Sequence, residues 1–90
     1  MTLLYSHPLF EQHKTGPHPE QPARLRAVLE GFATAGLTAK CIQPEWQPAT
    51  PTELGRLHGA DYVAHLDRFC QRGGGRLDAD TAVSEQSYAA

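Results

Sequence analysis

The chain has 90 residues, 20% of them charged, and a formal net charge of −2, so it forms one domain at most. No run of like charge suggests a surface for nucleic acid, and no apolar stretch is long enough for a membrane span. The first residues lack the cationic and apolar regions of a secretory signal peptide. We therefore expect a cytoplasmic protein that binds neither nucleic acid nor membranes.

The first structural elements are expected in the N-terminal half. Residues 2–6 are short and apolar and predict a buried strand, which Pro8 ends. Residues 7–26 follow as a loop too rich in proline for regular structure. A helix is expected from Pro22 to just before Gly36, and residues 39–43 predict a second strand. One apolar stripe marks the helix: Leu25, Val28, Leu29, Phe32 and Ala33.

Helices are also predicted in the second half. Thr50 and Glu53 have the spacing of a capping box, with Pro51 in the first turn. Asp61 is expected to cap or flank the next helix, which the glycines at 73–75 end. Residues 77–83 are turn-like. Ser84 is expected to cap a last helix over residues 85–90, with nothing in the sequence to end it.

The predicted order of strand, helix, strand and two helices is typical of an α/β protein. Two strands do not complete a sheet with both faces covered. We therefore interpret residues 1–90 as the N-terminal segment of a larger single domain.

Three histidines in the proline-rich loop suggest a metal site, but their spacing argues against one. His7, His13 and His18 lie six and five residues apart, whereas helical zinc sites use a spacing of four. Hydrogen bonds to the backbone are the favoured role. Cys41 and Cys70 have apolar neighbours and are expected to be free thiols.

Three blocks of the sequence resemble the histone deacetylase superfamily of zinc-dependent deacetylases and acetylpolyamine amidohydrolases. They are His13-x-x-Gly16-x-His18-Pro19-Glu20-x-Pro22-x-Arg24-Leu25, then Ala49-Thr50-Pro51-Thr52-Glu53-Leu54-x-x-Leu57-His58-x-x-Asp61-Tyr62-Val63, then Asp78-x-Asp80-Thr81 with Ser87-Tyr88-Ala89-Ala90. The Asp-x-Asp-Thr form resembles the bacterial, class II-like branch.

The resemblance implies an arginase-like, three-layer α/β/α domain with a parallel sheet. It also implies an intact enzyme that removes acyl groups from acyl-lysine or acyl-polyamine substrates. In the family, two aspartates and a histidine hold zinc. A pair of histidines acts on the metal-bound water, and a tyrosine, or in some members a histidine, polarises the substrate carbonyl. None of these residues maps onto positions 1–90. The segment alone is therefore expected to hold no metal and to be inactive.

The residues that do map are peripheral to the chemistry. The resemblance places His18 and Pro19 on a rim loop of the substrate channel, and Asp80 near a rim position that accepts substrate N–H groups. It places Arg24 at an internal cavity, where its forked donors suit a carboxylate. Two alternatives remain open: a buried structural ion pair that ties the helix to the sheet for Arg24, and a helix-capping or turn-forming role for Asp80.

Two hypotheses of different class follow. In the first, the chain is part of an intact zinc-dependent deacetylase. In the second, it is a short non-catalytic binding module or one half of a split deacetylase. The sequence beyond Ala90 would distinguish them.

Overall fold

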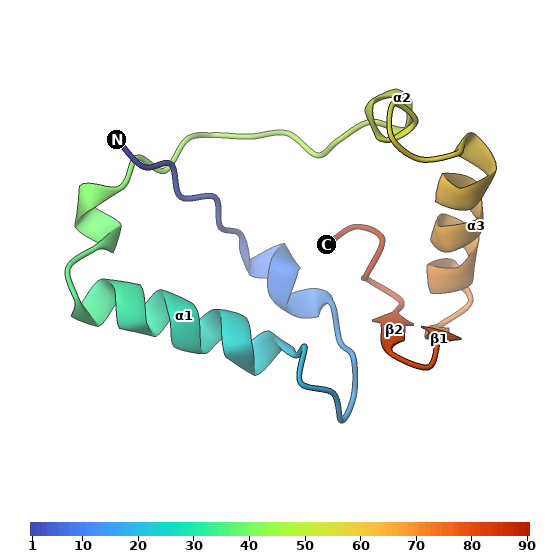
Figure 1. The fold of residues 1–90 in the computed structure, drawn as a ribbon, viewed down its shortest axis with the longest axis horizontal. Helices are drawn as coiled ribbons and strands as arrows, with labels where there is room; N and C mark the ends of the chain where they lie inside the picture. The colour runs from blue at the N-terminus through green and yellow to red at the C-terminus, as the bar shows by residue number, and fades with distance from the viewer.

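The computed structural model describes all residues from Met1 to Ala90, which form an open, flattened arrangement of short elements (Figure 1). Helix α1 (Pro22–Thr34) lies opposite α3 (Ala60–Gln71), and residues 44–50 run extended from η2 (Thr38–Lys40) to α2 (Pro51–Leu54). The chain extends over 41 × 32 × 18 Å. In chain order the elements are η1 (Pro8–Gln12), α1 (Pro22–Thr34), η2 (Thr38–Lys40), α2 (Pro51–Leu54), α3 (Ala60–Gln71), β1 (Gly74–Asp78) and β2 (Thr81–Ser84).

The predicted first helix is confirmed as α1. Pro22 occupies its first turn, where the missing N–H has no partner to lose. Gly36 follows the helix at φ +73°, in the left-handed region. Its N–H donates to the Ala33 carbonyl at 3.1 Å, and the Leu37 N–H donates to Phe32 at 2.8 Å. This Schellman pair satisfies two carbonyls of the last helical turn.

The capping box of α2 is also confirmed. The Glu53 N–H donates to Thr50 Oγ1 at 3.2 Å, and the Thr50 N–H donates to Glu53 Oε1 at 3.1 Å. Helix α3 begins at Ala60 with Gly59 as its N-cap. Asp61 therefore lies inside the first turn, where its negative charge suits the positive end of the helix dipole. Of the two predicted roles for Asp61, to cap or to flank the helix, the capping role is wrong.

The predictions for residues 73–90 are wrong in two respects. Helix α3 does end before the glycines at 73–75, but the last two of these glycines and the segment predicted as turn-like form an antiparallel hairpin of β1 and β2, joined through Ala79 and Asp80. Position 74 of β1 requires glycine, because a Cβ there would lie 2.3 Å from the Val83 carbonyl oxygen. The predicted helix at 85–90 is a set of turns, so Ser84 ends a strand and does not cap a helix.

The two predicted N-terminal strands reduce to one isolated parallel bridge between Leu3 and Ile42. Two backbone hydrogen bonds form it: the Leu4 N–H donates to Ile42 at 2.8 Å, and the Ile42 N–H donates to Thr2 at 2.9 Å. Residues 38–40 form η2 instead of a strand. The proline-rich loop also contains regular structure, because His7 Nδ1 accepts the Leu9 N–H at 3.0 Å and caps η1.

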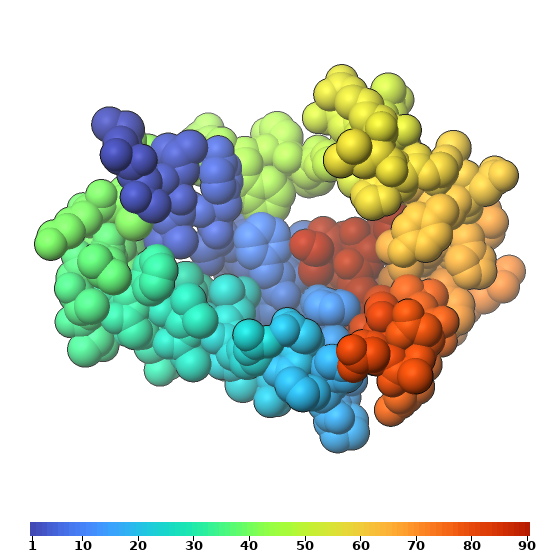
Figure 2. Space-filling model, viewed as in Figure 1, coloured from blue at the N-terminus to red at the C-terminus, as the bar shows by residue number.

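Very little of the chain is buried. Only Val63 and Cys70, both on α3, are buried, with 7% and 1% of their surface exposed. Figure 2 shows an opening through the middle of the molecule, bordered by residues near 50 and by the C-terminal residues. Large apolar side chains remain exposed along the chain, among them Leu3, Tyr5, Val28, Ile42, Leu57 and Tyr62.

The cysteines and the helices can each be compared with an expectation from the sequence. Both cysteines are free thiols, Cys70 buried and Cys41 half-buried. No helix has the length and hydropathy needed to cross a bilayer.

Candidate functional site

A polar surface hollow of about 300 Å³ lies between the loop that precedes α1 and the β1–β2 hairpin. We call it the loop–hairpin groove. It brings together two of the segments singled out in the sequence, although more than 50 residues separate them. Its lining residues are Lys14, Thr15, Gly16, Pro17, His18, Gly73, Gly75, Arg76, Ala79, Asp80, Thr81, Ala82 and Val83.

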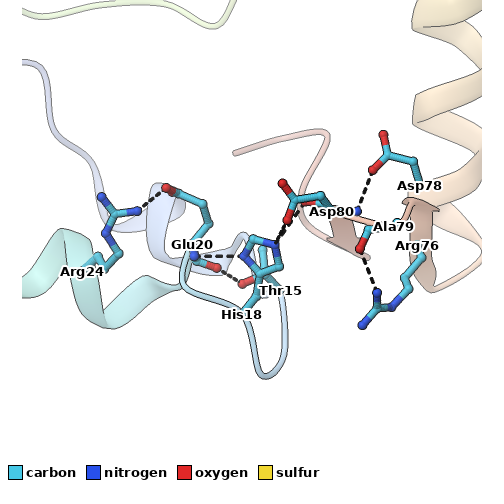
Figure 3. Close-up of polar contacts among 8 residues, drawn as sticks. All are labelled: Thr15, His18, Glu20, Arg24, Arg76, Asp78, Ala79 and Asp80. Carbon is cyan, nitrogen blue, oxygen red and sulfur yellow. Dashed lines mark hydrogen bonds and ion pairs between the residues drawn. The ribbon is translucent and has the colours of Figure 1, made fainter.

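His18 connects the two walls of this groove (Figure 3). Its Nδ1 accepts the Glu20 N–H at 3.0 Å, so in the neutral ring the hydrogen resides on Nε2. That nitrogen lies 3.1 Å from the Asp80 carbonyl oxygen and 3.2 Å from Asp80 Oδ1. His18 thus donates one shared hydrogen bond to both oxygens, while 19% of its side chain is exposed.

Asp80 lies at the tip of the hairpin and is fixed there by its backbone. Its N–H donates to Asp78 Oδ1 at 2.8 Å, and Arg76 donates to the neighbouring Ala79 carbonyl at 3.0 Å. The hydrogen bond from the Asp80 N–H, followed by one from the Thr81 side chain, holds the pKa of Asp78 below its ordinary value of 3.8. The Asp80 side chain itself is 97% exposed.

A serine pair attaches the loop to the hairpin at a second place. Ser84 Oγ accepts the Lys14 N–H at 3.1 Å and donates to the Gln12 carbonyl at 3.3 Å. Ser87 Oγ accepts the Ser84 N–H at 2.7 Å and lies 2.7 Å from His13 Nδ1. The loop is therefore attached near both of its ends, by Ser84 and Ser87 at one and by His18 at the other.

Arg24 lies on the first turn of α1 and forms an ion pair with Glu20. Both side chains are well exposed, at 60% and 70%. Arg24 also borders a second hollow of about 300 Å³, together with Phe10, His13 and Leu25. The alternative of a buried ion pair that ties the helix to a sheet is wrong, because this pair is exposed and joins α1 to the loop just before it. The internal-cavity role stays a prediction.

No three His, Cys, Asp or Glu side chains of the chain come together in a way that could hold a metal ion. His7 caps η1, His13 contacts Ser87 and His18 contacts Asp80, so the three loop histidines serve three different segments. Zinc therefore does not fit the residues of this chain, and no chemical step can be assigned to it here.

The structure brings His18 and Asp80 into contact, whereas Pro19 is an exposed residue of the same loop with no side-chain polar group. The sequence reasoning missed the anchoring roles of Ser84 and Ser87. No local signal would have found them, because their partners lie 70 or more residues away.

Proteins named as deacetylases are similar to this chain in sequence and in structure. No family model matches the chain. A protein of Methanothermobacter thermautotrophicus named as a probable deacetylase is 30% identical over 98% of the chain. Histone deacetylase 15 of Arabidopsis thaliana is 35% identical over 82% of it. The crystal structure of an HDA15 HD domain superposes on 99% of the chain with a TM-score of 0.91 and 29% identity.

The chain is short relative to these proteins. It spans 26% of the Methanothermobacter protein, 14% of the Arabidopsis protein and 27% of the HDA15 domain structure.

Proposed function

Because the chain belongs to the histone deacetylase superfamily, we propose that it is one part of a zinc-dependent amidohydrolase that removes acyl groups from acyl-lysine or acyl-polyamine substrates. The deacetylase names of the relatives support the reaction class. The zinc ligands and the catalytic residues are assigned to parts of the domain outside residues 1–90. The segment alone is inactive, and the intact protein works in the cytoplasm.

Within that enzyme, we assign the loop–hairpin groove to the rim of the substrate channel. The observation that carries this assignment is the contact between His18 and Asp80. It joins two blocks that the family resemblance places at the rim, and it leaves the Asp80 carboxylate exposed at the groove. A carboxylate in this position accepts hydrogen bonds from substrate N–H groups. Pro17 and Pro19 restrict the loop that forms the opposite wall.

Arg24 is assigned to an internal cavity that closes only when the rest of the domain packs against α1. Its support is the hollow beside it, which Phe10, Leu25 and Val28 line with apolar groups. A guanidinium in such a place would attract the carboxylate of a released acid. Its present partner, Glu20, would compete for the same donors.

The domain is proposed to be a three-layer α/β/α structure of the arginase-like type, with a parallel sheet and the class II-like features of the Asp-x-Asp-Thr block. The parallel bridge between Leu3 and Ile42 supports the strand direction. The exposed apolar side chains of α1 and of residues 1–5 support a further layer that covers them.

The proposal is tested by acetate release from the intact protein. Purified enzyme is incubated with an acetylated-lysine peptide and, separately, with an acetylated polyamine. Hydrolysis of either substrate, lost on chelation and restored by zinc, is the expected result. A folded, zinc-supplemented protein that hydrolyses neither substrate would refute the proposed reaction class, and metal-independent hydrolysis would refute the proposed zinc dependence.

A further inference from the structure

The geometry points to a specific role for His18, which rests on the proposed function: we propose that His18 is a positioning residue that orients the Asp80 carboxylate toward the backbone N–H groups of a peptide substrate. The role selects peptides over simple alkylamides, because only peptides present such N–H groups to the rim.

The imidazole ring of His18 is held in one orientation. Nδ1 is occupied by the Glu20 N–H at 3.0 Å, so the ring is not free to rotate by 180° without losing that bond. Nε2 then faces the hairpin and donates to Asp80. The ring thus links the start of α1 to the tip of the hairpin in one fixed direction (Figure 3).

The contact with His18 also restricts the Asp80 carboxylate. An aspartate side chain that is 97% exposed would ordinarily sample several rotamers. The shared hydrogen bond to the Asp80 carbonyl oxygen and Oδ1 favours one of them. The Asp80 Oδ2 atom makes no hydrogen bond in the structure. One oxygen is therefore held by His18, and the other is available to a ligand in the loop–hairpin groove.

The orientation of Asp80 and the folding of the groove depend on different contacts. Ser84 and Ser87 attach the same loop to the hairpin independently of His18. Loss of the Nε2 hydrogen bond should therefore release the Asp80 side chain while the groove keeps its walls. If His18 had a purely structural role, its loss would instead disturb both walls of the groove together.

A pair of substitutions tests this division. His18→Asn keeps an acceptor near the Nδ1 position for the Glu20 N–H but loses the donor that reaches Asp80. His18→Gln keeps a donor near the Nε2 position but loses the local acceptor. The intact enzyme and both variants are assayed with an acetylated-lysine peptide and with an acetylated alkylamine that has no peptide bond.

We expect His18→Asn to raise KM for the peptide about three- to tenfold, the effect of one lost hydrogen bond, with kcat preserved. His18→Gln should recover most of that loss. Neither variant should alter KM for the alkylamide, and His18→Asn should have no further effect in an Asp80→Asn background.

The proposal is overturned if the two variants raise peptide KM equally, if KM for both substrates rises together, or if the effect persists without the Asp80 carboxylate. These outcomes leave the proposed function intact, because the wild-type enzyme still hydrolyses its substrates. Absence of acetate release by the wild-type enzyme from both substrates refutes the proposed function instead, and the role of His18 with it.

Discussion

The Nε2 atom of His18 lies 3.1 Å from the carbonyl oxygen of Asp80 and 3.2 Å from its Oδ1, so that one imidazole joins residues 62 positions apart in the chain. The contact places a loop that precedes a helix against the tip of a hairpin. It also leaves a charged oxygen at the edge of a polar groove. This relationship is the basis of the rim role proposed for both residues.

The first prediction concerns the tautomer of His18. Because its Nδ1 accepts the Glu20 N–H, the neutral ring should carry its hydrogen on Nε2 alone. Nitrogen chemical shifts of histidine-labelled intact protein should therefore show one protonated and one bare nitrogen for this residue. His58, whose side chain is exposed and makes no hydrogen bond, serves as the control. A neutral His18 ring protonated on Nδ1 would contradict the geometry.

The second prediction concerns Gly74. An alanine Cβ there would lie 2.3 Å from the Val83 carbonyl oxygen, and the residue has φ +76°. Gly74→Ala should therefore destabilise the intact protein by about 2 kcal/mol or more and abolish the cross-strand contact between Gly75 and Val83. Denaturant unfolding and amide chemical shifts measure the two effects.

Gly31→Ala provides the matched control for this substitution. Gly31 lies within α1 and has nothing within 4 Å of an added Cβ, so alanine there should stabilise the helix by about 0.5–1 kcal/mol. Equal tolerance of both substitutions would show that β1 does not approach β2 as described.

The third prediction concerns pH. The hydrogen bonds from Asp80 and Thr81 favour the ionised Asp78 side chain and lower its pKa below 3.8. The stability that this carboxylate gives the hairpin should be fully present above pH 3.8 and be lost as the pH falls through the lowered pKa. The amide resonance of Asp80 should therefore titrate below pH 3.8, and Asp78→Asn should remove that transition. A midpoint above 3.8 would be evidence against these hydrogen bonds.

The fourth prediction concerns residues 1–90 in isolation. Only Val63 and Cys70 are buried among 90 residues, far fewer than a cooperative core requires. The isolated chain should unfold gradually on heating, without a sigmoidal transition, and should bind dyes that report exposed apolar surface. A sharp two-state transition of the monomer would show that the exposed apolar side chains need no further cover.

These results show which features were readable from the sequence. The apolar stripe and Gly36 predict α1, and Thr50 with Glu53 predicts α2, because each signal lies within a few residues of the structure that it forms. The family resemblance also predicts rim positions for His18 and Asp80, which are in contact in the structure.

Other features depended on partners distant in the sequence. The glycines at 73–75 are typical of the end of a helix, yet Gly74 and Gly75 also form part of β1. The missing Cβ of Gly74 lets β1 pass close to Val83. Residues 2–6 and 39–43 have strand-like sequences, but only one bridge joins them. The sequence around Ser84 indicates a helix cap, whereas its side chain accepts the N–H of Lys14, 70 residues before it.

The most direct test of the rim assignment is a crystal structure of the intact protein with an uncleaved acetylated-lysine peptide. We expect the peptide to lie in the loop–hairpin groove, with Asp80 Oδ2 accepting a peptide N–H and Nε2 of His18 still bonded to Asp80. A peptide bound at the zinc while the groove stays empty, or an Asp80 side chain directed away from it, would contradict this account.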